Sequence, residues 1–237
     1  MGQSHDASLS LSKNKLSNVE PGSSDTLSVQ ITNQGNGMET MSVGAEGLPP
    51  GWQVSFSQTS VTVGSANSGN NRETVTAEVF VPEDASAVED IVISFTVGRG
   101  GGSEPYDSKD LTISVAAKHS VTTSILSTQQ TGRSDQTVQF PIEVTNSGNI
   151  QDTFKLQACD PSDQTGCNSP MWESSFSDSE GNAITQIVLD PGQRQTVYLD
   201  VLVEGEEDAD SASVLDRIEI YGTNVADEHL SLIHISE

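Results

Sequence analysis

The sequence repeats one ordered set of features in its two halves, and this repetition constrains the fold more than any other feature. Residues 27–36 read LSVQITNQGN and residues 140–149 read FPIEVTNSGN. In both segments apolar and polar residues alternate, and both end in TNxGN. Alternation places every second side chain on one face of a β-strand, so each segment covers a core on one side and meets water on the other. The repetition indicates two copies of one folding unit.

The TNxGN endings predict tight turns, because Asn and Gly supply the positive φ values that such turns need. A second strand is expected after each turn, over residues 39–43 and 152–156. Each half then has a single Trp followed four residues later by a Phe. The two pairs are Trp52 with Phe56 and Trp172 with Phe176. Residues at even spacing on a strand share a face, so we expect these aromatic rings to pack in the cores and not to form a ligand platform.

Further short strands follow in the same order in both halves, separated by Gly, Pro, Asn and Ser, and no helical period is present. This pattern predicts an all-β chain of two tandem immunoglobulin-like antiparallel β-sandwich domains. The expected strands are 74–81, 91–97 and 111–115 in the first half, and 121–126, 196–203 and 217–221 in the second.

The expected boundaries are a disordered tail over 1–6, a sandwich over 7–117, a short linker over 118–120 and a sandwich over 121–229. The linker is short enough to favour a semi-rigid pair over two freely moving domains. After residues 217–221 the second sandwich has no counterpart of strand 111–115, so we expect it to lack its native last strand.

Residues 230–237, LSLIHISE, resemble the in-frame translation of a transposon-end adapter used to prepare sequencing libraries. We interpret them as a scar and the chain as a metagenomic fragment, and we exclude the segment from functional reasoning. The alternative is a genuine edge strand. Because LSLIHIS alternates, we expect it to pair in place of the missing strand.

Several short motifs carry a resemblance to a known family. They are VEPG at 19–22, TNxGN, GLPPGW at 47–52 and VPEDA at 81–85. The first half resembles the Ig-like domains related to bacterial cell-adhesion-related (CARDB) and α-galactosidase-associated repeats. The second half keeps TNxGN and the Trp but has DPGQ at 190–193 and lacks the LPPG run. The resemblance implies a place in a large surface protein or exoenzyme of a prokaryote, extracellular or at the cell surface.

The charge balance narrows the choice of partners. Thirty-four acids against ten bases give a net charge of −24. Phosphate backbones and anionic membranes would be repelled, so we exclude nucleic acid as a partner. No apolar run is long enough to span a bilayer, and residues 1–10 lack the regions of a signal peptide, so no membrane insertion by this segment is expected.

Cys159 and Cys167 flank a polar loop that the first half lacks. A local disulfide is the preferred interpretation, because two cysteines that end one loop can meet and an oxidising compartment would preserve the bond. The chain-entropy description assigns such a loop roughly 2–3 kcal/mol. Two cysteines without a neighbouring histidine cannot form a tetrahedral zinc site.

Acidic loops offer the only candidate metal ligands. Calcium takes six to eight oxygen ligands, which such loops could supply, but EF-hand spacing is absent and solvated loop charge is the competing interpretation. The calcium candidates are Glu204, Glu206, Glu207, Asp208 and Asp210, with Asp160 and Asp163 in the cysteine loop. No other cofactor is expected.

Catalytic motifs are absent, including HExxH, GxSxG and a phosphate-binding loop. The four histidines fall in the tail (His5), the linker (His119), the end of the second half (His229) and the scar (His234). None is expected where a sandwich would position a general base, so the chain is predicted not to be an enzyme.

Together these features predict a non-catalytic structural or adhesion-related spacer of a larger extracellular prokaryotic protein. The alternative is an accessory module of a secreted glycosidase or protease. Expected partners are flanking domains of the same polypeptide, and a cell-surface protein or polysaccharide where the module binds one.

Overall fold

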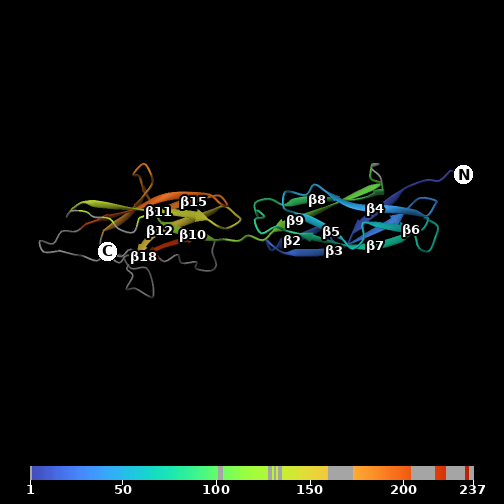
Figure 1. Cartoon of the computed structure of the whole chain (residues 1–237), viewed down its shortest axis with the longest axis horizontal. Helices are drawn as coiled ribbons and strands as arrows, with labels where there is room; N and C mark the ends of the chain where they lie inside the picture. The colour runs from blue at the N-terminus through green and yellow to red at the C-terminus, as the bar shows by residue number, and fades with distance from the viewer. Residues whose placement is uncertain are drawn as a thin grey trace. The chain divides into compact units, whose positions relative to one another are not determined.

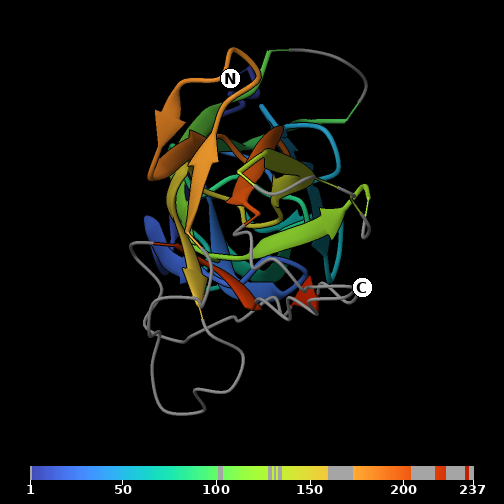
Figure 2. The same ribbon diagram turned by 90° about the vertical axis from the view of Figure 1, so that its left-hand side faces the viewer.

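The computed structural model describes residues 2–100, 104–127, 130, 132, 135–159, 173–203, 217–222 and 233–234. The chain divides into two compact units, Met1–Ala117 (unit 1) and Lys118–Glu237 (unit 2). The described elements are all β-strands, and in each unit they form two sheets (Figures 1 and 2). The chain is therefore a tandem pair of Ig-like β-sandwich domains, as the sequence predicts.

Unit 1 consists of a four-stranded sheet in the order β1-β3-β7-β5 and a five-stranded sheet in the order β2-β9-β8-β4-β6. The pairing is antiparallel except between β2 and β9, which run parallel. The strands are β1 (Ala7–Leu11), β2 (Lys15–Val19), β3 (Ser24–Asn33), β4 (Glu39–Glu46), β5 (Gln53–Phe56), β6 (Ser60–Val63), β7 (Arg72–Phe80), β8 (Ile91–Arg99) and β9 (Asp107–Val115).

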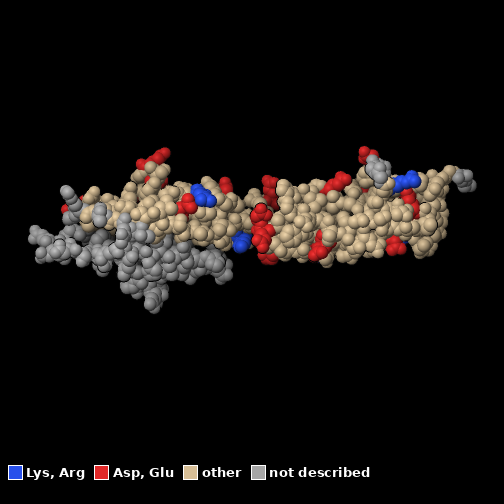
Figure 3. Space-filling view, in the orientation of Figure 1, with Lys and Arg blue, Asp and Glu red and all other residues tan. Residues whose placement is uncertain are grey.

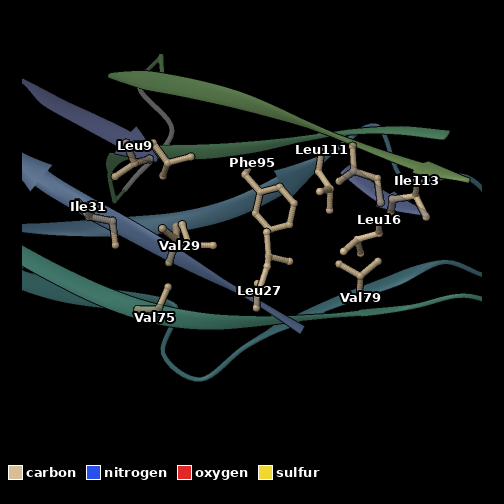
Figure 4. Packing of buried hydrophobic residues seen from close by; sticks show 14 of the residues in the cluster. Leu9, Leu16, Leu27, Val29, Ile31, Val75, Val79, Phe95, Leu111 and Ile113 are labelled. Carbon is tan, nitrogen blue, oxygen red and sulfur yellow. The ribbon is translucent and has the colours of Figure 1, made fainter. Parts of the chain in front are cut away.

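The core of unit 1 follows from the alternation in its strands. Leu27, Val29 and Ile31 of β3 are almost fully buried, whereas the residues between them are exposed or partly exposed. Their side chains belong to one buried cluster with Phe95 of β8, and the ring of Phe95 lies between the two sheets (Figure 4). The ring of Phe95 meets that of Phe56 edge to face, with centroids 5.9 Å apart and planes at 83°. Such pairs add to the free energy gained from burial alone.

The VEPG motif at residues 19–22 forms a turn just before β3. Gly22 has φ of 76° and the Ser23 amide donates to the carbonyl of Glu20. Two expected strands were too short. The strands predicted over residues 91–97 and 111–115 are longer in the structure, because β8 extends to Arg99 and β9 begins at Asp107. The added residues pair through their backbone and are mostly polar, so hydrophobic alternation could not reveal them.

Unit 2 repeats this plan, with sheets in the orders β10-β11-β16-β13-β14 and β15-β12-β17-β18. Its core centres on Phe154, Ile142 and Leu199. The strands are β10 (Val121–Ile125), β11 (Thr137–Asn146), β12 (Asp152–Cys159), β13 (Ser174–Ser177), β14 (Ala183–Ile184), β15 (Gln186–Leu189), β16 (Arg194–Leu202), β17 (Arg217–Gly222) and β18 (Ile233–His234).

The final segment pairs as expected. β18 lies antiparallel to β17, with Arg217 opposite His234 and Ile218 opposite Ile233. In unit 1 the equivalent partner of β8 is β9, which pairs over residues 107–113. β18 therefore covers only a short part of the edge of β17, whereas β9 covers a longer part of the equivalent edge of β8 in unit 1.

Candidate functional site

A buried asparagine organises the turn that follows β3. Asn33 is fully buried, and its side-chain nitrogen donates to the carbonyls of Gly37 (2.8 Å) and Val63 (3.3 Å). Its side-chain oxygen accepts from the Gly35 amide at 2.8 Å. One amide side chain thus ties three backbone groups together. We call the turn and this side chain the asparagine corner, residues 33–39 in unit 1 and 146–152 in unit 2.

Unit 2 builds the same corner from Asn146, which is also fully buried. Its side-chain nitrogen donates to the carbonyls of Ile150 (2.8 Å) and Leu189 (2.9 Å), and its oxygen accepts from the Gly148 amide (2.9 Å). The TNxGN repeat therefore encodes a hydrogen-bond arrangement as well as a turn.

The glycines of the two corners allow another backbone segment to pack closely against them, and they are not needed for a positive φ. The sequence-based expectation of a left-handed turn was wrong, because the residues with positive φ include neither Gly35 nor Gly148. A Cβ on Gly35 would collide with the carbonyl oxygen of Ser4, and one on Gly148 would collide with that of Lys118. Only glycine leaves room there for the backbone that precedes each sandwich.

That preceding backbone is itself bound to the corner, and we call it the lead-in segment, residues 3–6 in unit 1 and 118–120 in unit 2. Residues 1–6 were expected to form a disordered tail. In the structure the Ser4 amide donates to the Asn36 side chain at 2.9 Å, and the Gln34 amide donates to the Asp6 carbonyl at 2.9 Å.

Each lead-in segment carries a histidine that reaches a buried carboxylate. Nδ1 of His5 lies 2.9 Å from Oε2 of Glu39, and Nδ1 of His119 lies 2.9 Å from Oδ2 of Asp152. The carboxylate side chains are 7% and 1% exposed. A buried carboxylate requires hydrogen-bond donors or a cation to offset its lost hydration. The histidine supplies a donor in both units.

Unit 1 surrounds its carboxylate with further partners. The hydroxyl of Tyr106 donates to Oε1 of Glu39 at 2.8 Å, and Nε of Arg99 lies 4.0 Å from the same oxygen. Burial alone would raise the pKa of Glu39, but the hydrogen bonds from His5 and Tyr106 and the nearby positive charges outweigh it and lower the pKa. Burial and the Glu39 carboxylate raise the pKa of Tyr106.

The lowered pKa predicts a specific acid sensitivity of unit 1. A carboxyl with a lower pKa in the folded state contributes stability above its unfolded pKa, here near the ordinary 4.5, and loses it as the pH falls through the folded pKa. In urea unfolding from about pH 5 to about pH 2, the wild type should lose more free energy of unfolding than Glu39→Gln. Parallel curves for the two proteins would contradict this role of Glu39.

Sequence reasoning missed both histidine–carboxylate pairs. His5 and His119 were assigned to a tail and a linker, because the polar residues around them have no hydrophobic alternation. A signal was present: each histidine stands two residues before the first strand of its unit, β1 or β10. The carboxylates open the strands that follow the corners, with Glu39 at the start of β4 and Asp152 at the start of β12.

The aromatic residues singled out from the sequence lie in or against the cores where they are described. Trp52 is 8% exposed and Phe176 is 5% exposed. Phe56 is partly buried against the core of unit 1. Trp172 lies outside the described residues.

The predicted disulfide and calcium ligands fall largely outside the described part of the chain. Cys159 ends β12, whereas Cys167 is not among the described residues. The same holds for every acidic residue proposed for calcium, namely Glu204, Glu206, Glu207, Asp208 and Asp210, and for Asp160 and Asp163. Within the described ranges, no group of three or more His, Cys, Asp or Glu side chains could hold a metal ion.

Unit 1 also has a surface hollow of about 330 Å³ between the loops before β5 and before β8. Its walls include three prolines, Pro49, Pro50 and Pro82, together with Trp52. Asp84 and Glu89 also line it.

On the face drawn in Figure 3, acidic side chains form several separate groups and basic ones are few. Among the described residues, no helix is long and apolar enough to cross a membrane.

Comparisons with known proteins find similarity among solved structures alone. No family model and no curated protein matches the chain. Among solved structures it is similar to a protein of unknown function from Porphyromonas gingivalis W83, with 13% identity, coverage of 96% of this chain and 97% of that chain, and a TM-score of 0.33.

Two further similar structures belong to longer proteins. The Escherichia coli adhesin FdeC is 12% identical, with coverage of 100% of this chain and 65% of that chain and a TM-score of 0.34. The secreted serine protease VesC from Vibrio cholerae is 12% identical, with coverage of 95% and 50% and a TM-score of 0.32. The chain thus spans half the length of VesC and about two thirds of that of FdeC.

Proposed function

We propose that the chain is a non-catalytic, structural or adhesion-related spacer in an extracellular or cell-surface protein of a prokaryote. The observation that carries this proposal is the repeated asparagine corner. In both units the corner binds the backbone that leads into the sandwich, so each unit fixes the position at which the preceding chain arrives. A spacer needs this property, because flanking domains are held apart only if the connections between units are fixed.

The polar chemistry of the corners supports the same proposal. Both oxygens of the Glu39 carboxylate are engaged, Oε2 by His5 and Oε1 by Tyr106. Asp152 accepts from His119 through Oδ2 and from the Thr153 amide through Oδ1. These groups stabilise the fold through one another, which is the role of a structural network.

The aromatic side chains also favour a spacer over a sugar-binding module. Flat surfaces that bind polysaccharides stack sugar rings on exposed aromatic side chains. Every aromatic side chain that the structure describes is buried or partly buried, including Trp52, Phe80 and Tyr198. The spacer would therefore act through its length and its attachment to flanking domains of the same polypeptide. The membership in CARDB-like repeats is part of this proposal.

An accessory module of a secreted glycosidase or protease is the second candidate, and the hollow beside Trp52 favours it. A glycan array probed with the full chain separates the two. The spacer predicts no saturable binding. Reproducible binding that is lost in Ser86→Trp, which fills the hollow from its exposed rim, would replace the spacer with the accessory module.

A further inference from the structure

The connection between the units presents one residue that an extracellular protease could attack. Residues 116–120 join β9, which ends at Val115, to β10, which begins at Val121. Ala117 and Lys118 are exposed. Lys118 is the only Lys or Arg between Lys109 and Arg133, so trypsin-like cleavage in this region has a single target.

The backbone at this target is nevertheless fixed by unit 2. The Lys118 amide donates to Oδ1 of Asn149 at 2.7 Å, and the Asn149 amide donates back to the Lys118 carbonyl at 3.0 Å. Two residues later, the Ser147 amide donates to the Ser120 carbonyl at 3.0 Å. The Lys118 carbonyl also lies against Gly148, where a Cβ has no room. Three hydrogen bonds thus fix residues 118 and 120.

The residue between them, His119, is fixed by a contact of its own side chain. Its Nδ1 lies 2.9 Å from Oδ2 of Asp152, whose side chain is 1% exposed. Lifting residues 118–120 from the corner would expose this carboxylate or leave it buried without its histidine, and both outcomes cost free energy. The pair therefore resists local opening of the lead-in segment.

We propose that the asparagine corner of unit 2 has a further function, which is to protect the connection between the units from proteolysis. A protease binds its target as an extended segment of several residues, so Lys118 can be cleaved only after residues 118–120 leave the corner. The rate of cleavage then follows the population of the opened state. This inference rests on the proposed spacer function, because a spacer outside the cell fails when its connection is cut.

Limited trypsin digestion of the full chain tests the proposal. Two variants loosen the lead-in segment in different ways: Gly148→Ala places a methyl group against the Lys118 carbonyl, and Asp152→Asn removes the charge that His119 contacts. We expect each to accelerate cleavage after Lys118 by about ten-fold, which corresponds to about 1.4 kcal/mol of opening free energy. Mass spectrometry of fragments 1–118 and 119–237 gives the rate.

A matched control exists in unit 1. Gly35→Ala makes the equivalent change against the Ser4 carbonyl and should leave cleavage after Lys118 unchanged. Cleavage after Arg194, the first residue of β16, reports unfolding of unit 2 itself. Unchanged cleavage after Lys118 in both variants would overturn the proposal. Equal acceleration at Lys118 and Arg194 would overturn it too, since opening would then be global. The glycan array tests the spacer independently of either result.

Discussion

Replacing Phe95 with alanine is expected to lower the free energy of unfolding of unit 1 by about 3–5 kcal/mol. Phe95 is fully buried at the centre of β8, between the two sheets, and contacts Phe56 edge to face (Figure 4). Its removal loses the transfer free energy of a large aromatic group and leaves a cavity that two paired sheets cannot close. Urea unfolding followed by circular dichroism, with calorimetry to separate the transitions, measures the loss.

Phe154→Ala is the matched control, because Phe154 is fully buried in the core of unit 2. Each unit has its own core, so Phe95→Ala should shift one transition and Phe154→Ala the other. If either substitution shifted both transitions equally, the units would unfold as one body. That result would contradict the description of the chain as two self-contained sandwiches.

The strands that bury these side chains were largely predictable, because the information lies within each strand. Leu27, Val29 and Ile31 alternate with polar residues, and alternation directly reports a half-buried strand. The same holds for the residues from Trp52 to Phe56. β1 and β2 were missed, although both contribute to the core of unit 1. Each has five residues, and β2 pairs in parallel with β9, a partner distant in sequence that no local pattern reveals.

The asparagine corners could be predicted only in part. The TNxGN repeat marked their position, but their function depends on partners that come from elsewhere in the chain. Asn33 donates to Val63, 30 residues later, and Asn146 donates to Leu189, 43 residues later. A polar lead-in segment has no hydrophobic pattern, so its sequence resembles that of a free tail or linker. Only the fold brings His119 to Asp152.

The corners also give a prediction in which the replacement of one heavy atom has a large effect. Asn33→Asp keeps the shape of the side chain but replaces an NH₂ donor with a carboxylate oxygen, opposite the carbonyls of Gly37 and Val63. The new charge would be fully buried among acceptors. We expect a loss of about 3–5 kcal/mol in the free energy of unfolding of unit 1 at about pH 7, because an unpaired buried charge is among the costliest changes.

The pH dependence of this variant identifies the cause. Burial among acceptors raises the pKa of an aspartate, so the folded variant binds a proton more readily than the unfolded chain does, and stability must increase as the pH falls. Asn33→Asp should therefore recover part of its loss between about pH 8 and about pH 5. Asn36→Asp is the control in the same turn. The Asn36 side-chain oxygen accepts from the Ser4 amide and its nitrogen donates to the Gly2 carbonyl, so the substitution also removes a donor, but Asn36 is exposed and water solvates the new charge. The control should stay within about 0.5 kcal/mol of the wild type. A loss in Asn33→Asp that does not change with pH would show that the charge is not its cause, and the assignment of the Asn33 amide as a double donor would then be wrong.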